Sequence, residues 1–161
     1  MRALVVGLAL GAASVAAAAE WDTIAPGVTT MDGVRARFGA PTRTDRQKTE
    51  SYDTTTWTYE DAQAPTGMIR AVVDFGLLTK HGYRPDLVRT MRIEPKPGVF
   101  NRIAVVNAWG EPTGVAREND ADVFFYPAGL LVYFDKAGES AVVMIFTPPQ
   151  PPASPAPPAP R

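Results

Sequence analysis

The 161-residue sequence contains no cysteine and only one histidine, His81. The missing cysteine excludes disulfides, thiolate metal ligands, a cysteine nucleophile and a lipid attached through cysteine. A zinc or triad-type site has too few members when no second histidine is present, so we expect His81 to be a solvated loop residue. The sequence therefore predicts no metal and no other cofactor.

The chain also lacks an excess of charge of either sign. Lysine and arginine number 16 against 17 acidic residues, and a nucleic-acid binder normally shows a concentrated basic face. The acidic cluster 118–122 lacks the glycine and distal glutamate of a calcium loop. Glu60 and Asp61, adjacent on a strand, would point to opposite faces. With no phosphate loop or nucleophile elbow either, we predict that the protein is not an enzyme and does not bind nucleic acid.

What the chain does have is an export signal. Arg2 precedes a short apolar stretch and an alanine-rich end, which is the pattern of a secretory signal peptide over residues 1–19. Ala17 and Ala19 satisfy the small-x-small rule, so the predicted cleavage follows Ala19. An uncut membrane anchor would need about 20 strongly apolar residues, and leucine and valine become scarce after Leu10. The sequence predicts a periplasmic or secreted protein with no stable membrane anchor after cleavage.

The other end of the chain is rich in proline. Eight of the fourteen residues in 148–161 are proline, and the remainder are chiefly alanine and serine. Such a run forms neither helix nor sheet, so we predict a disordered, extended tail. Residues 20–147 remain, which is the size of one typical domain or of two small ones that share a core.

A sequence pattern recurs within this region. Pro26-Gly27-Val28 followed by Phe38-Gly39-Ala40-Pro41-Thr42 matches Pro97-Gly98-Val99 followed by Trp109-Gly110-Glu111-Pro112-Thr113, always 71 residues apart. Seven positions match in register, which predicts a duplicated unit.

Each copy of this pattern indicates a short helix. In the first copy Thr29 and Asp32 resemble a capping box, and apolar residues at 31, 34 and 38 form one helical face. Gly39 occupies the position of a helix-terminating glycine. In the second copy the equivalent apolar stripe is formed by Val99, Ile103 and Val106.

Three strand-like runs follow each predicted helix, because β-branched and aromatic residues gather between turn residues. The runs are 54–60, 68–75, 87–94, 121–126, 129–135 and 140–147. The predicted fold is therefore α+β, with two tandem helix–three-strand repeats over residues 20–95 and 96–147. Their helices would pack on one face of an antiparallel sheet.

The motifs at 24–29 and 38–42 resemble the entry motif of the BamE (SmpA/OmlA) family of outer-membrane assembly lipoproteins. Residues 129–138 resemble the central hairpin of that family. The duplication is similar to that of the β-lactamase-inhibitor protein, which carries the fold in tandem. The resemblance implies the fold and a place in the bacterial envelope. It transfers no binding residue, since this chain has neither the lipidated cysteine of the first protein nor the disulfides of the second.

The strands of the second half are apolar on both faces, unlike those of a simple two-layer fold. Three explanations stay open: a core shared between the halves or a face covered by the tail or by residues 76–86, homodimerisation, and a surface for a partner protein. The candidate partner-binding residues are Phe124, Tyr126, Leu131, Tyr133, Val143 and Ile145.

From these observations the sequence predicts a non-catalytic exported protein-binding module of the bacterial envelope, which uses an apolar and aromatic sheet face. The partner would be another envelope protein or a second copy. The alternative is an envelope or outer-membrane assembly or structural component, in which the proline-rich tail acts as a spacer.

Overall fold

The computed structural model describes residues 17–150. Residues 1–16 of the predicted signal peptide and residues 151–161 of the predicted tail lie outside this range. The described elements, in chain order, are α1 (Met31–Phe38), β1 (Arg43–Thr49), β2 (Tyr52–Glu60), the 3₁₀ turn η1 (Asp61–Gln63), β3 (Met68–Thr79), β4 (Gly82–Pro95), α2 (Arg102–Trp109), β5 (Gly114–Glu118), β6 (Ala121–Tyr126), β7 (Leu130–Phe134) and β8 (Ala141–Phe146).

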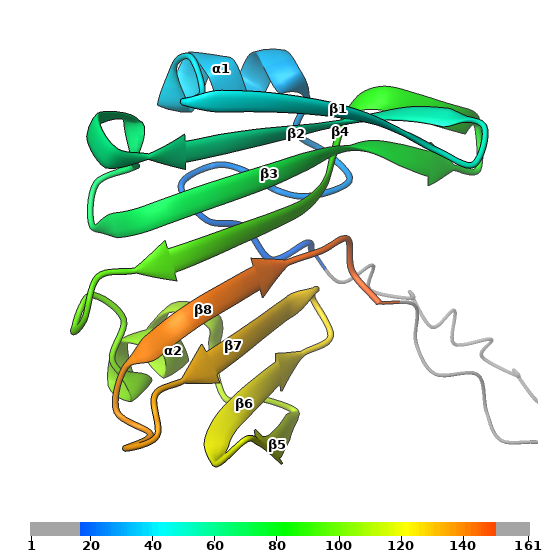
Figure 1. Cartoon of the computed structure of the whole chain (residues 1–161). Helices are drawn as coiled ribbons and strands as arrows, with labels where there is room; N and C mark the ends of the chain where they lie inside the picture. The colour runs from blue at the N-terminus through cyan, green and yellow to red at the C-terminus, as the bar shows by residue number, and fades with distance from the viewer. Residues whose placement is uncertain (1–16, 151–161) are drawn as a thin grey trace, which may run out of the picture.

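All eight strands belong to one antiparallel sheet with the spatial order β1-β2-β3-β4-β8-β7-β6-β5. Strands β1 to β4 follow one another across the sheet. The chain then crosses over through α2 and returns to β4 with its last strand, β8, so that β5 forms the far edge (Figure 1). The contact between β4 and β8 joins the two groups of strands through three residue pairs, Met91↔Phe146, Arg92↔Ile145 and Ile93↔Met144.

The fold predicted from the sequence, two tandem helix–three-strand repeats, is wrong. The structure has a single continuous sheet of eight strands with two short helices, and four strands follow each helix. The two strands that sequence patterns missed are β1 and β5, which form the two edges. Both are almost entirely exposed and carry charged side chains, so they lack the apolar alternation that indicates a strand.

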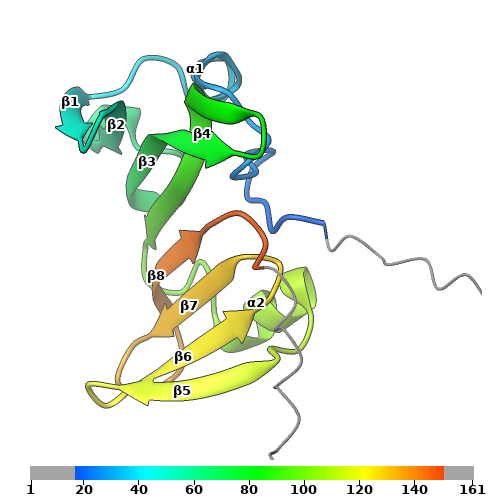
Figure 2. The ribbon, with the colours of Figure 1, turned by 90° about the vertical axis from the view of Figure 1, so that its right-hand side faces the viewer.

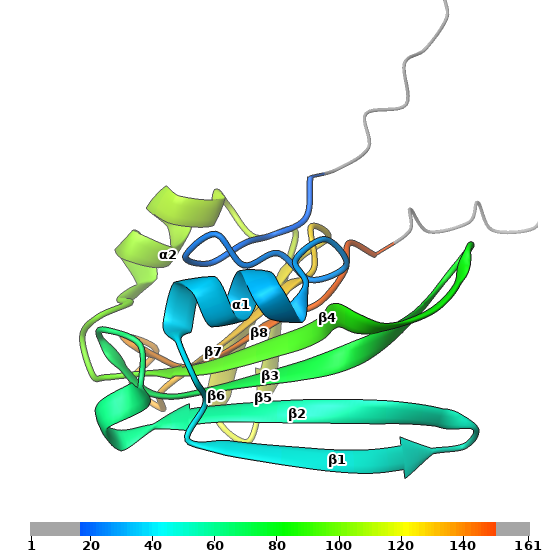
Figure 3. The same cartoon turned by 90° about the horizontal axis from the view of Figure 1, so that it is seen from above.

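Both helices lie on the same side of the sheet, as Figures 2 and 3 show, and the segment that precedes α1 lies beside them. Val34 of α1 and Val105 of α2 are buried completely against the sheet. The side chains beneath the helices form one hydrophobic core that includes Tyr59, Phe75 and Phe146. Among the described residues, no helix is long and apolar enough to cross a membrane.

Helix α1 begins and ends where its side chains complete the backbone hydrogen bonds. The hydroxyl of Thr30, rather than that of Thr29, accepts a hydrogen bond from the Gly33 amide at the first turn. The Gly39 amide donates to the Arg35 carbonyl, and its φ of 78° suits glycine. The Gly39 carbonyl in turn accepts a hydrogen bond from the buried Tyr59 hydroxyl at 3.2 Å.

Helix α2 is held to the sheet in the same manner. Asn101 caps its first turn by accepting from the Ala104 amide at 2.8 Å. The Tyr126 hydroxyl donates to the Gly110 carbonyl beyond its end at 3.0 Å. The exposed side of α2 carries Ile103, which sequence periodicity had placed on the buried stripe.

The two ends of the described chain both pack on the domain near the β6–β7 turn. The Ala19 amide donates to the Ala128 carbonyl at 2.7 Å. The Gln150 amide donates to the Pro127 carbonyl at 3.0 Å, so residues 148–150, the start of the predicted disordered tail, lie against the domain.

Candidate functional site: the open face of the sheet

The face of the sheet opposite the helices is here called the open face. Strand register defines it, because residues paired across neighbouring strands point to the same side. One row of such residues crosses all eight strands, from β1 to β5: Arg43, Thr58, Val72, Arg92, Ile145, Leu131, Phe125 and Gly114. The row is polar on the side of β1 and apolar on the side of β5.

Several polar side chains on the polar half of the open face pair with one another. The Asp74 carboxylate accepts hydrogen bonds from the Thr56 hydroxyl at 2.6 Å and the Thr90 hydroxyl at 2.7 Å, which links β2, β3 and β4. Arg92 lies 3.1 Å from Glu94 on the same strand. Since these charges already have partners, this half offers a neutral, hydrogen-bonded surface rather than a concentrated charge.

On the apolar half of the open face, five exposed or partly exposed side chains from β6, β7 and β8 form what we call the open-face patch: Phe125, Leu131, Tyr133, Val143 and Ile145. Phe125 is 48% exposed, and the other four are partly exposed. Val123, which pairs with Tyr133 on the same face, is 2% exposed and is not part of the patch. Val142, next to the irregular pairing between β7 and β8, is exposed beside them. A cluster of this kind on one sheet face is typical of an interaction surface.

A groove of about 360 Å³ opens at the boundary between the two halves. Its lining combines apolar side chains, among them Tyr133, Val143 and Ile145, with the charged groups of Arg92 and Glu118. This volume is at the lower end of the roughly 300–1,000 Å³ of small-molecule sites. Protein interfaces likewise combine apolar contacts with polar and charged groups.

The structure brings four of the six predicted site residues together on this face: Leu131, Tyr133, Val143 and Ile145. It does not bring Phe124 and Tyr126 there. Phe124 is 4% exposed and Tyr126 is 6% exposed, and both belong to the core beneath the helices.

Phe125 is the residue of β6 that pairs with Leu131 on the open face, and sequence reasoning missed it. The β6 run 123–126 is apolar throughout, so alternation within it could not show which side is buried. The missing signal is the register across the 127–129 turn, where Tyr126 pairs with Leu130 and thereby places Phe125 opposite Leu131. The segment 76–86, considered as a cover, instead forms the end of the long β3–β4 hairpin.

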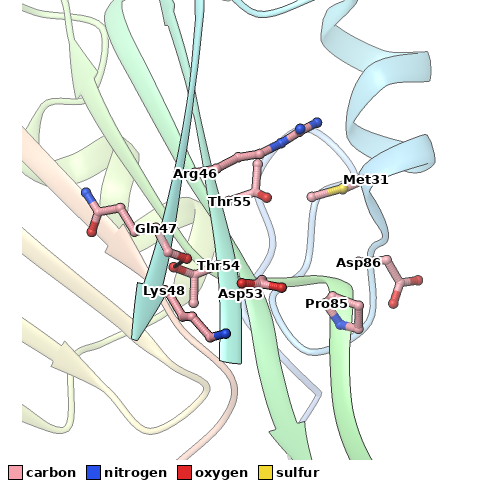
Figure 4. A pocket seen from close by; sticks show the side chains of 9 residues that line it. All are labelled: Met31, Arg46, Gln47, Lys48, Asp53, Thr54, Thr55, Pro85 and Asp86. Carbon is pink, nitrogen blue, oxygen red and sulfur yellow. Dashed lines mark hydrogen bonds between the residues drawn. The ribbon is translucent and has the colours of Figure 1, made fainter. Parts of the chain in front are cut away.

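A second cavity, of about 510 Å³, lies on the helix side between the start of α1 and the ends of β1 and β2. Figure 4 shows Arg46 and Thr55 extending from the strands toward Met31 of α1, with Lys48 and Asp53 nearer the strand ends. Arg46 and Lys48 share this cavity with the carboxylates of Asp53 and Asp86, so its charges balance.

The Asp86 carboxylate in this cavity is already paired with a neighbouring arginine. Arg84 donates two hydrogen bonds to its carboxylate, of 3.1 Å and 3.0 Å, and these bonds hold the pKa of Asp86 below its ordinary value. The carboxylate is thereby kept ionised and paired, which is unsuited to the role of a proton donor.

Asp122 and His81, which the sequence analysis considered as candidates, lie in different parts of the structure. Asp122 of the acidic cluster accepts a hydrogen bond from Arg102 at 2.6 Å. His81 is exposed at the tip of the β3–β4 hairpin. Within residues 17–150 no group of three or more histidine or acidic side chains is placed to hold a metal ion.

Comparisons with known proteins identify no relative by sequence. No protein-family model matches the chain, and no curated protein matches it. One solved structure is similar, the crystal structure of a DUF4309 family protein (YjgB) from Bacillus subtilis. The similarity has a TM-score of 0.41 and 11% sequence identity, and covers 78% of this chain and 82% of that chain. So distant a likeness says nothing about function.

The resemblance to the BamE family, inferred from the turn and hairpin motifs, is wrong. No family model matches the chain. The fold is one eight-stranded sheet with two short helices, not a pair of BamE-like repeats. Turn, helix-stop and hairpin motifs satisfy local backbone geometry, so unrelated sheet proteins can share them.

Proposed function

We propose that the protein is a non-catalytic binding module of the bacterial envelope, which binds another protein through the open face of its sheet. The observation that carries this proposal is the open-face patch itself: five apolar and aromatic side chains, of which Phe125 is half exposed, on the sheet face opposite both helices of the described residues 17–150. Burying such a patch gains about 25 cal/mol for each Å² of apolar surface removed from water.

The chemistry of the groove defines the kind of partner. Its lining of Tyr133, Val143 and Ile145 suits a bulky apolar side chain, while the Glu118 carboxylate, and Arg92 alongside its ion pair with Glu94, can hydrogen-bond to the backbone around it. We therefore expect the partner to present a loop with one or two large apolar side chains flanked by polar groups. The location outside the cytoplasm comes from the export signal and is part of the proposal.

Capture from an envelope fraction tests this proposal if three baits are compared. The baits are the wild-type chain, Phe125→Ser in the patch, and Ile103→Ser as a matched control. Ile103 is exposed on α2, which lies on the other side of the sheet. We expect one protein to be retained in stoichiometric amount by the wild-type and control baits and lost from the patch variant.

Two other results would replace the proposal. A wild-type chain that is dimeric in analytical ultracentrifugation, with a monomeric Phe125→Ser variant, would show that the patch binds a second copy. Retention of outer-membrane complexes by all three baits would favour an assembly role that does not use the patch.

A further inference from the structure

Packing of the N-terminal segment into the core of the domain begins at Ala19. The Ala19 amide donates to the Ala128 carbonyl at 2.7 Å, and the residue is 5% exposed and belongs to the core cluster. Immediately after it, the Glu20 carbonyl accepts a hydrogen bond from the Trp109 indole of α2 at 3.3 Å. Ala19 is thus a structural residue of the domain.

The two residues before Ala19 differ from it in burial. Ala17 is exposed and Ala18 is only partly buried. Ala17 and Ala18 line a hollow beside α2. Neither belongs to the core cluster, which includes Ala19. The boundary between the domain and whatever precedes it therefore lies between Ala18 and Ala19.

This boundary bears on where a signal peptide would be removed. A signal peptidase requires small residues at the first and third positions before the cut bond. Two adjacent registers meet this rule with alanine at both positions, Ala16 with Ala18 and Ala17 with Ala19. A cut after Ala19 would remove a hydrogen bond and a buried methyl group from the domain, whereas a cut after Ala18 would keep both.

We infer that processing cleaves the Ala18–Ala19 bond, one residue before the cleavage predicted from the sequence, so that Ala19 is the first residue of the mature protein. This inference rests on the proposed export. Hydrolysis adds one water molecule across the peptide bond and leaves a carboxylate on Ala18 and an α-ammonium group on Ala19. The ammonium nitrogen is the atom that donates to the Ala128 carbonyl, and a donor with positive charge makes a stronger hydrogen bond than a neutral amide.

The inference is tested by expressing the full chain in a bacterial host, purifying the protein from the periplasm or medium, and determining its N-terminus by intact-mass spectrometry and N-terminal sequencing. We expect the chain to start at Ala19. A start at Glu20, or at Ala17 or Ala18, would overturn the inference while leaving export intact. A chain that keeps its first residues and stays in the cytoplasm would overturn both.

A second measurement tests the physical reason. Chains that start at Ala18, Ala19 and Glu20, released from a cleavable fusion, would be compared by thermal and urea unfolding. The chain that starts at Glu20 is expected to have an unfolding constant about tenfold larger and a Tm about 5 °C lower than the chain from Ala19. The chain from Ala18 is the matched control: it keeps both contacts through a neutral amide, so its Tm should exceed that of the chain from Glu20 and be no higher than that of the chain from Ala19. Equal stability of all three chains would overturn the inference.

Discussion

The buried hydroxyl of Tyr59 makes a prediction that depends on pH. Its side chain is fully buried in β2, and the hydroxyl donates to the Gly39 carbonyl behind α1. Burial raises the pKa of Tyr59 from 10.0 to about 12, against a smaller opposing effect of the Arg35 cation. The folded protein therefore keeps this phenol neutral at a pH where the unfolded chain has already ionised it.

The sign of the pH effect follows from this difference. The pKa of Tyr59 is raised in the folded state, so its contribution to stability is complete below pH 10 and is lost as the pH rises toward 12. The free energy of unfolding falls by about 1.4 kcal/mol for each pH unit in this window, or about 2 to 3 kcal/mol in total. The variant Tyr59→Phe has no such loss.

At neutral pH the variant Tyr59→Phe should be less stable than the wild type, by about 1 kcal/mol, because it lacks one hydrogen bond. The two curves should cross where the wild type has lost about 1 kcal/mol through this residue, and by pH 11.5, where that loss is about 2 kcal/mol, the variant should be the more stable protein by about 1 kcal/mol. Urea unfolding followed by circular dichroism from pH 8 to 11.5 measures both values. At pH 8 the variant Tyr52→Phe is the control for the loss of a tyrosine hydroxyl. Because Tyr52 is exposed, this variant should change the free energy of unfolding by less than about 0.5 kcal/mol. Parallel wild-type and Tyr59→Phe curves across the whole range would refute the reasoning.

Two further predictions concern stability. Arg102 donates hydrogen bonds to the Gly138 carbonyl and to the Asp122 carboxylate. Its guanidinium also lies 4.8 Å from the ring centres of Phe124 and Phe134. Arg102→Met should therefore lower the free energy of unfolding by about 2 to 3 kcal/mol. In urea unfolding the exposed Arg117→Met should cost less than about 0.5 kcal/mol, and equal losses would contradict this account. A Cβ at Gly129 would lie 2.1 Å from the Thr147 carbonyl oxygen, so Gly129→Ala should cost more than about 3 kcal/mol. At Gly82 the φ is also positive but the space is open, so thermal unfolding of Gly82→Ala should show a loss of only about 1 kcal/mol; a reversed order would refute the steric argument.

Six of the eight strands could be located from the sequence, because their β-branched and aromatic runs are bounded by turn residues. The two edge strands could not. In β1, the sequence Arg43–Thr49 carries no large apolar residue and is a strand only because each residue pairs with β2. In β5, Gly114–Glu118 depends in the same way on β6. Local patterns do not report such tertiary pairing.

The limits of prediction at the site have a similar origin. In β7 and β8 the alternation of side chains along each strand shows that both faces of the sheet are apolar. It also places Leu131 with Tyr133, and Val143 with Ile145, on one face, as the strand pairing has them. In β6 four apolar residues follow one another, and only the pairing of Tyr126 with Leu130 shows that Phe125 faces outward. The apolar stripe predicted for α2 was also wrong, because Ile103 is exposed whereas Val105 is buried.

The most direct test of the central claim is the dissociation constant of the captured partner for three purified chains: wild type, Phe125→Ser and Ile103→Ser. If the open-face patch is the binding surface, Phe125→Ser should weaken binding at least tenfold, since truncating an aromatic at the centre of an interface typically costs more than 1.4 kcal/mol. Ile103→Ser should bind as the wild type does. Equal affinity of all three chains, with Tm values that agree within about 2 °C, would contradict the claim that this protein binds its partner through the open face.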